Sequence, residues 1–127
     1  MADATQAGMT FGACLRSIRS ERKISLRQLA REVQITPTYL SDLERGNNHP
    51  PDKELLKKLI FALDLQHDEE AWQTLLDLAA QERNDLPADI KDGLMNNRPL
   101  QMLIRKIQQT PDCEKLCTKL IHELSIN

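Results

Sequence analysis

The sequence predicts an all-α fold, and both its composition and its pattern of capped apolar segments support this. Aromatic residues make up only 3% of the 127 residues, and no stretch is rich in aromatic and β-branched side chains as strands are. A core of this composition rests on Leu, Ile and Ala, which favour helices. Apolar residues also recur at helical spacing along the chain, and breaks such as residues 46–51 and 84–87 separate the segments.

The first half of the chain contains five segments that each follow a residue able to cap a helix. The capping residues are Thr10, Ser25, Thr36, Asp52 and Asp68. The helices expected after them span residues 11–22, 26–33, 37–45, 53–63 and 69–82. Ser25 has Gln28 three positions later, which predicts a capping box, and Pro37 occupies the preferred first helical position after Thr36.

The second half is also predicted to be helical, but it is punctuated differently. Residues 84–87 (Asn-Asp-Leu-Pro) break the chain. Helices are expected over residues 88–95, from Pro99 to residue 109, and from Thr110–Pro111 to residue 124. The predicted organisation is a flexible N-terminus (1–9), a five-helix domain (10–84) and a short C-terminal helical module (85–127).

Charge differs between the two halves. The net charge of −2 argues against a protein that coats nucleic acid without specificity. Residues 1–66 nevertheless carry ten basic and eight acidic side chains, whereas residues 67–127 carry seven and eleven. This asymmetry predicts two roles, with contact to an anion in the first half and an acidic balance in the C-terminal module.

The cysteines and the known sequence motifs exclude several classes of protein. Three cysteines without regular spacing fit a reducing compartment and do not form a disulfide framework. Neither a signal peptide nor a membrane span is expected, so the predicted location is cytoplasmic. Cys113 and Cys117 lie one helical turn apart; a metal or redox site is conceivable, but a place on the apolar side of a helix is the favoured explanation. No catalytic motif is found, so neither an enzyme nor a cofactor is expected.

Residues 25–45 have the spacing of a helix-turn-helix motif. Two expected helices are separated by a turn of two or three residues, and their apolar positions are Leu29, Ala30, Ile35, Leu40 and Leu43. The second helix then presents short polar side chains outward at its N-terminus. A helix with such a face fits the major groove of DNA.

The stretch LRSIRSERKISLRQLAREVQITPTYLSDLERGNNHPP resembles the DNA-binding domain of the lambda-repressor and Cro type, also called the xenobiotic-response-element family. The resemblance covers about residues 11–65 and implies a five-helix fold whose third helix reads DNA. It also implies a buried ion pair between Arg19 and Glu44. Two positions depart from the family pattern: Leu26 replaces a Gln that touches phosphate, and Gln34 replaces a Gly in the turn.

The residues expected to contact DNA come from this resemblance and from the basic residues that flank the recognition surface. The loop residue His49 matches a segment that touches backbone phosphates, as do the two asparagines before it. The expected DNA-binding set is Ser25, Arg27, Thr36, Pro37, Thr38, Tyr39, Ser41, Asp42, Arg45, Asn47 and Asn48. For Asp42 two explanations remain equal: it faces the bases, where it accepts from a cytosine or rejects wrong sequences, or it pairs with Arg45 at i+3.

The predicted function is a dimeric transcriptional repressor that reads a palindromic operator in double-stranded DNA with the helix 36–45. The apolar rows of the C-terminal module exceed what an isolated helix can bury, which favours a homodimer. The alternative is an antitoxin-type or peptidase-released repressor, in which residues 85–127 bind a protein partner.

Overall fold

The computed structural model describes residues 8–126, and this part of the chain consists of eight α-helices without a strand. The all-α class predicted from composition is therefore confirmed. The part of the expected flexible N-terminus that precedes Gly8 lies outside the described residues. The helices are α2 (Phe11–Glu21), α3 (Leu26–Glu32), α4 (Pro37–Arg45), α5 (Lys53–Ala62), α6 (Glu69–Arg83), α7 (Ala88–Leu94), α8 (Arg98–Gln109) and α9 (Cys113–Ile126).

All five helix caps expected in the first half are present. In each, a side-chain oxygen accepts a hydrogen bond from the backbone N–H three residues later, which satisfies a donor that the helix itself cannot. The bonds are Thr10 to Ala13 (3.1 Å), Ser25 to Gln28 (3.1 Å), Thr36 to Tyr39 (3.0 Å), Asp52 to Leu55 (3.0 Å) and Asp68 to Ala71 (3.2 Å).

The beginning of the last helix differs from the sequence prediction. Thr110 does not start a helix; its hydroxyl donates to the Lys106 carbonyl at 2.8 Å, and its backbone is extended, so Thr110 ends α8 instead. Helix α9 begins at Cys113, after Asp112 with a positive φ of 58°. Helix α8 begins one residue earlier than expected, with Asn97 as its cap and Pro99 in its first turn.

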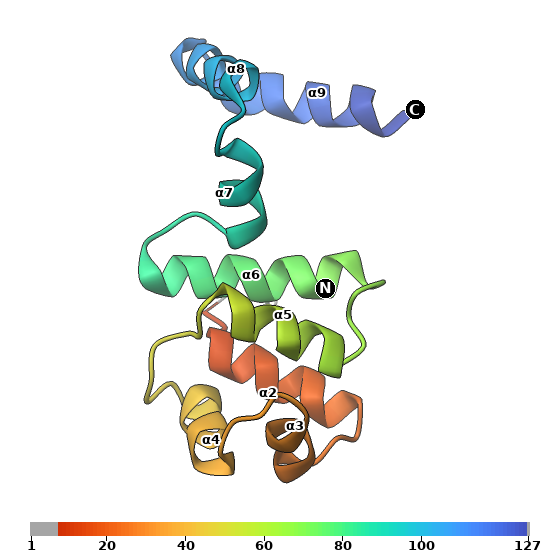
Figure 1. Cartoon of the computed structure of the whole chain (residues 1–127). Helices are drawn as coiled ribbons and strands as arrows, with labels where there is room; N and C mark the ends of the chain where they lie inside the picture. The colour runs from red at the N-terminus through yellow and green to blue at the C-terminus, as the bar shows by residue number, and fades with distance from the viewer. Residues whose placement is uncertain (1–7, 127) are drawn as a thin grey trace. The chain divides into compact units, whose positions relative to one another are not determined.

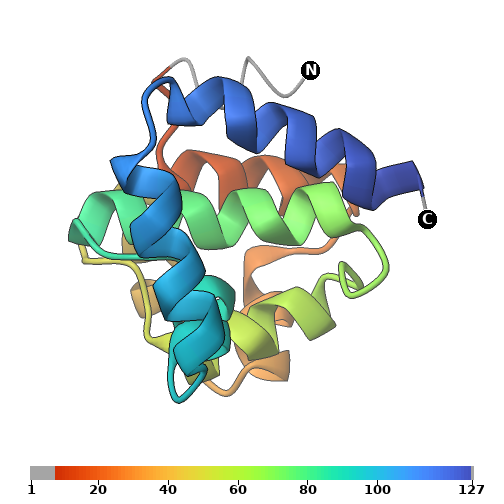
Figure 2. The same ribbon diagram turned by 90° about the horizontal axis from the view of Figure 1, so that it is seen from above.

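The chain forms two compact units, divided between Asp89 and Ile90. We call residues up to Asp89 the N-terminal unit and residues from Ile90 the C-terminal unit. The N-terminal unit extends past the break at residues 84–87 because Ala88 packs against its core. Helix α2 lies at the centre of this unit: it contacts α4 on one side and α6 on the other (Figures 1 and 2).

The core of the N-terminal unit is built almost entirely from leucines. Leu15, Leu29, Leu40 and Leu63 are fully buried, and Phe11 is the one aromatic side chain among the buried residues. Helix α2 can approach α4 closely because residue 12 is glycine. A Cβ atom there would lie 2.3 Å from the Leu43 carbonyl oxygen, closer than any real side chain allows.

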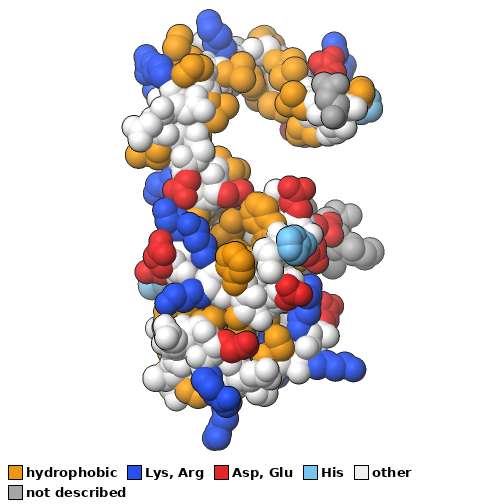
Figure 3. Space-filling view, turned by 45° about the vertical axis from the view of Figure 1, so that its right-hand side comes forward, with side chains coloured by type: hydrophobic (Ala, Val, Ile, Leu, Met, Phe, Trp, Pro, Cys, Tyr) orange, Lys and Arg blue, Asp and Glu red, His pale blue; other side chains and the backbone are white. Residues whose placement is uncertain are grey.

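The C-terminal unit has no such core. Helices α8 and α9 contact each other, but none of the described residues from Ile90 onward is buried. Hydrophobic side chains line the visible face of this unit in Figure 3. The most exposed large apolar residues are Ile90, Met95, Met102, Leu103, Ile121, Leu124 and Ile126.

The acidic residues are not where the division into halves placed them. The C-terminal module (85–127) carries six basic and six acidic side chains, so it is not acidic as expected, and residues 90–127 alone carry six basic and four acidic. The acidic excess lies in residues 63–89, which carry eight acidic side chains and one basic, and which belong to the N-terminal unit. Counting by sequence halves missed this because α6 folds onto α2.

None of the helices within residues 8–126 combines the length and the apolar character that crossing a membrane requires.

Candidate nucleic-acid interface

Helices α3 and α4 pack against each other through the apolar positions of the motif. Leu29 and Ala30 of α3 and Leu40 of α4 are completely buried. The turn between the helices relies on Gln34, whose φ of 63° lies in the left-handed region. This conformation lets the Ile35 N–H reach back to the Ala30 carbonyl at 2.9 Å and closes α3 in the usual C-terminal manner. The non-glycine residue in the turn is accommodated at a cost of roughly 1–2 kcal/mol.

The N-terminus of α4 projects short side chains into solvent. Thr36, Pro37 and Thr38 are exposed, while Ser41 and Asp42, one turn further on, are half-buried. Pro37 has no N–H and Thr36 caps that of Tyr39, so the N–H of Thr38 is the free donor of the first turn, and it lies at the positive end of the helix dipole. A helix end with small polar side chains and a free donor can enter a major groove and approach base edges.

Tyr39 has a more structural position than its neighbours. Its side chain is half-buried and packs against the core of the N-terminal unit. It also lines an open hollow of about 500 Å³ together with Asn48 and His49 of the following loop. Tyr39 therefore has a packing role in addition to any contact with DNA.

The loop after α4 is polar and is held at both ends. Gly46 ends the helix with φ 79°, and the Asn47 N–H bonds to the Asp42 carbonyl at 2.9 Å. Asn47 and Asn48 are exposed, whereas the next two prolines are buried. The Arg83 guanidinium of α6 donates to the Pro50 carbonyl, which fixes the far end of the loop.

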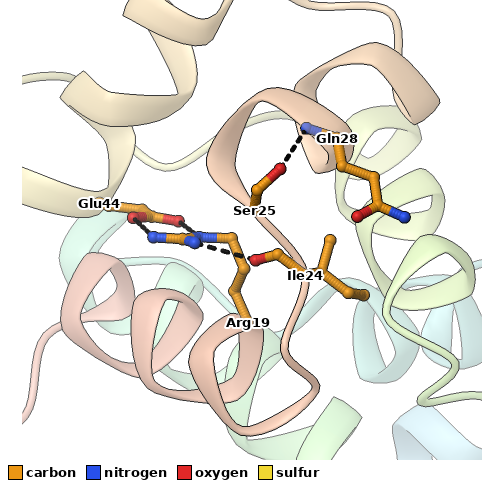
Figure 4. A network of polar contacts seen from close by, with 5 residues as sticks. All are labelled: Arg19, Ile24, Ser25, Gln28 and Glu44. Atoms are coloured by element: carbon orange, nitrogen blue, oxygen red, sulfur yellow. Dashed lines mark hydrogen bonds and ion pairs between the residues drawn. The ribbon is translucent and has the colours of Figure 1, made fainter.

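Arg19 and Glu44 form a bidentate ion pair between α2 and α4 (Figure 4). Arg19 Nε lies 2.7 Å from Glu44 Oε2, and Arg19 Nη2 lies 3.0 Å from Oε1. The side chains are only 15% and 5% exposed. The hydrogen bond to Glu44 raises the pKa of the Arg19 guanidinium, against the opposing effect of burial.

The same guanidinium also orients α3. Arg19 Nη1 donates to the Ile24 carbonyl at 3.0 Å, and Ile24 directly precedes Ser25, the cap of α3 (Figure 4). One side chain thus ties α2 to α4 and to the start of α3, and the latter two elements carry most of the expected contacts.

The start of α3 presents a mixture of polar and apolar side chains. Ser25 and Arg27 are exposed, and the Ser25 hydroxyl is engaged as the helix cap. Within the described chain the Gln28 side chain returns no bond to Ser25, so only half of the predicted capping box forms. Leu26 is half-buried against the core, so it offers no polar contact where the family has Gln.

Asp42 forms an exposed pair with Arg45, with 3.5 Å between Asp42 Oδ1 and Arg45 Nη2. This is the helix-surface arrangement that one of the two explanations for Asp42 expected. An exposed i,i+3 pair is worth little and yields readily to a stronger partner. Base contact by Asp42 and phosphate contact by Arg45 both remain predictions.

Charge is segregated within the N-terminal unit. Residues 11–62, which include α2 to α5, carry ten basic and six acidic side chains. The eight acidic residues of segment 63–89 belong to α6 and its flanks, and α6 lies on the side of α2 away from α3 and α4 (Figure 1). The electrostatic potential therefore favours the approach of a polyanion to the side of α3 and α4 over its approach to the side of α6.

Two positioning residues were not identified from the sequence. Gly12 sets the approach of α2 to α4, and Arg83 fixes the loop that carries the asparagines. A glycine inside an expected helix is a detectable signal, since it costs about 1 kcal/mol relative to Ala and needs a packing reason. The contact from Arg83 to Pro50 links residues far apart in sequence and leaves no local signal.

Comparison with known proteins gives a consistent result. Residues 10–73 match a family model described as a helix-turn-helix domain, and this segment contains α2 to α5 with the start of α6. No solved structure matches the chain.

Two curated proteins are similar over the same region. The chain is 34% identical over 59 residues to the HTH-type transcriptional repressor RghR of Bacillus subtilis (strain 168), a stretch covering 46% of this chain and 44% of that protein. It is 36% identical over 58 residues to the immunity repressor protein of Bacillus phage phi105, covering 46% and 40%. The aligned stretch thus spans less than half the length of these relatives.

Proposed function

The chain belongs to the helix-turn-helix domain family, and on this premise we propose that it is a sequence-specific transcriptional regulator of double-stranded DNA, acting as a dimeric repressor. The observation that carries the proposal is the geometry of α3 and α4: a recognition helix with an exposed, capped N-terminus is held by the buried Arg19–Glu44 pair. Both relatives are named as repressors, which supports the sign of regulation.

In the proposed complex α4 enters the major groove. Thr36, Pro37, Thr38 and Ser41 face base edges, and Asp42 accepts from a cytosine or rejects other bases. Polar groups on and around this helix fix its register on the phosphates. These are Ser25, Arg27, Tyr39, Arg45, Asn47 and Asn48. Repression follows from occlusion of a promoter in the cytoplasm of a bacterium or in a phage-infected cell.

The dimer is proposed to form through the C-terminal unit. The unit has about 38 residues, and a segment this small usually needs a disulfide, a metal or another chain to be stable. Leu103 is 50% exposed and Leu124 76%, so both offer apolar surface for a second copy of the same unit. The two α4 helices of the dimer would then contact half-sites about one helical turn of DNA apart, roughly 10 base pairs.

Selection from a random duplex library tests the reading of DNA. We expect the full chain to enrich an inverted repeat, and Thr38→Ala to lose about 1–3 kcal/mol of discrimination at one base position. Lys119→Ala, an exposed substitution on α9, should leave the selected sequence unchanged. Enrichment of no sequence would contradict the proposal.

Sedimentation tests the dimer. The wild-type chain should be dimeric at micromolar concentration, Leu103→Lys should be monomeric, and Gln108→Lys on the same helix should remain dimeric. A monomeric wild type would instead favour the second candidate function, in which α9 binds a protein partner as in an antitoxin or a peptidase-released repressor. Its exposed end, with Ile121, Leu124 and Ile126, is the observation that favours this alternative.

A further inference from the structure

We propose that a hollow along α2 seats a phosphate of the DNA backbone, so that α2 extends the interface beyond the helix-turn-helix motif. The hollow has a volume of about 650 Å³ and lies against the C-terminal end of α4. It is lined by Arg16, Ser17 and Ser20 of α2 and by Arg45 and Asn47. The inference rests on the proposed function. It assigns phosphate binding to Arg16, Ser17 and Ser20, which lie outside the expected DNA-binding set.

The lining supplies the groups that bind phosphate. Two guanidinium groups, two hydroxyls and one amide can all donate hydrogen bonds to phosphate oxygens. Arg16, Ser17 and Ser20 occupy one face of α2 because they follow helical spacing, and all three are exposed. Within residues 8–126, Arg16 has no carboxylate within ion-pair distance, so its charge is available to an anion.

The acidic groups nearby do not cancel this charge. Glu44 also lines the hollow, but both of its oxygens are held by the Arg19 guanidinium at 2.7 and 3.0 Å. Asp42 pairs with Arg45 at 3.5 Å, and the Arg45 side chain is 61% exposed. This pair is solvated, so a phosphate at the hollow can draw Arg45 away from it.

The hollow is continuous with the candidate interface. Arg45 and Asn47 belong to both, and the Arg19 contacts with Glu44 and Ile24 place this part of α2 between the end of α4 and the start of α3. Ser25 lies at that start, next to Ile24 (Figure 4). A DNA strand that reaches the ends of α3 and α4 therefore passes the exposed face of α2. Five of the seven lining side chains carry hydrogen-bond donors, and two of these are cations, which favours a phosphate over an apolar segment of a protein.

The experiment compares variants on the duplex that the wild-type chain selects. Binding is measured by fluorescence anisotropy over a series of salt concentrations, on the selected duplex and on a scrambled one. Arg16→Gln should raise Kd about 3- to 10-fold on both duplexes and reduce the salt slope by about one per bound subunit. Ser20→Asp, which places a carboxylate in the hollow, should weaken binding further.

Arg105→Gln, on the exposed face of α8, is the matched control because it removes the same charge elsewhere. Circular dichroism checks that all variants fold. If the wild type binds its selected sequence and Arg16→Gln has the same Kd and salt slope as Arg105→Gln, the phosphate site on α2 is wrong and the proposed function stands. A changed base preference in Arg16→Gln would also overturn it. A wild type that neither selects a sequence nor binds duplex DNA overturns both proposals.

Discussion

The two units of this protein form helices equally well but bury them very differently. Every buried apolar side chain among the described residues lies at or before Ala80. Helices α7, α8 and α9 contain no buried residue. Helix α8 nevertheless has a clear apolar side and a good cap at Asn97. Caps and spacing create an amphipathic helix, but only a partner surface gives it a core.

Because the two units bury such different amounts of apolar surface, we expect their stability to have different sources. The N-terminal unit has an internal core and a buried ion pair, so it should fold on its own and respond strongly to core substitutions. The C-terminal unit should respond to protein concentration instead, because we propose that a second chain covers its exposed apolar side chains. Substitutions matched between the two units test whether their sources of stability differ in this way.

The largest effect is expected at the buried pair. Glu44→Ala should lower the free energy of unfolding by about 3–5 kcal/mol, because it leaves the Arg19 charge buried without its partner. Thermal unfolding followed by circular dichroism measures this loss. Asp42→Ala breaks only an exposed pair and should cost less than about 1 kcal/mol. Equal losses in the two variants would show that the Arg19–Glu44 pair does not hold the motif.

Leucines at opposite extremes of exposure compare the cores directly. Leu15 is completely buried, so Leu15→Ala should cost about 2–5 kcal/mol in urea unfolding. Leu124 is 76% exposed, so Leu124→Ala should cost no more than about 0.5 kcal/mol at a concentration where the chain is monomeric. A large loss at Leu124 under those conditions would reveal a core that the C-terminal unit makes by itself.

Two helical glycines should respond with opposite sign. Gly12→Ala forces a Cβ atom against the Leu43 carbonyl and should destabilise the protein by about 1–3 kcal/mol. Gly93, in α7, has open space around it, so Gly93→Ala should stabilise that helix by about 0.5–1 kcal/mol. Urea unfolding and helical content from circular dichroism measure the pair. Stabilisation by Gly12→Ala would contradict the close approach of α2 to α4.

The smallest effect concerns pH. Burial raises the pKa of the Cys14 thiol, and Glu21 adds to the effect. Below the ordinary thiol pKa of about 9, both the folded and unfolded forms keep the proton. Above it the unfolded form loses the proton first, so the free energy of unfolding falls by up to about 1.4 kcal/mol per pH unit.

Urea unfolding between pH 8 and pH 10 checks this decline. Cys14→Ala should fall less steeply than the wild type, and Cys117→Ala in the C-terminal unit should keep the wild-type slope. Identical slopes in wild type and Cys14→Ala would remove the thiol as the cause.

Much of the helical structure could be predicted because its signals are local. A cap such as Thr36 or Asp52 acts on the N–H three residues later, so it can be identified without knowing the fold. The predicted start of α9 was wrong because the Thr110 hydroxyl donates to the Lys106 carbonyl and ends α8. A threonine between two helices can bond back to the helix before it or cap the helix after it, and the neighbouring sequence alone does not decide which.

The expected site residues also divide by physical cause. Thr38 and Arg45 lie on exposed faces, where helical spacing places them. Arg16 was not anticipated because its role depends on the hollow that α2 forms with the end of α4. The acidic balance was misplaced for the same kind of reason, since α6 folds back onto α2 and keeps its carboxylates in the N-terminal unit.

The helices, their caps and the helix-turn-helix family could be read from the amino-acid sequence alone, because short-range hydrogen bonds and apolar spacing specify them. How those helices act together depended on packing. It brought Glu44 to Arg19, required glycine at position 12, placed the acidic segment behind the motif and left the C-terminal helices without a core. These features depend on contacts between residues distant in sequence, and such contacts exist only once the chain has packed.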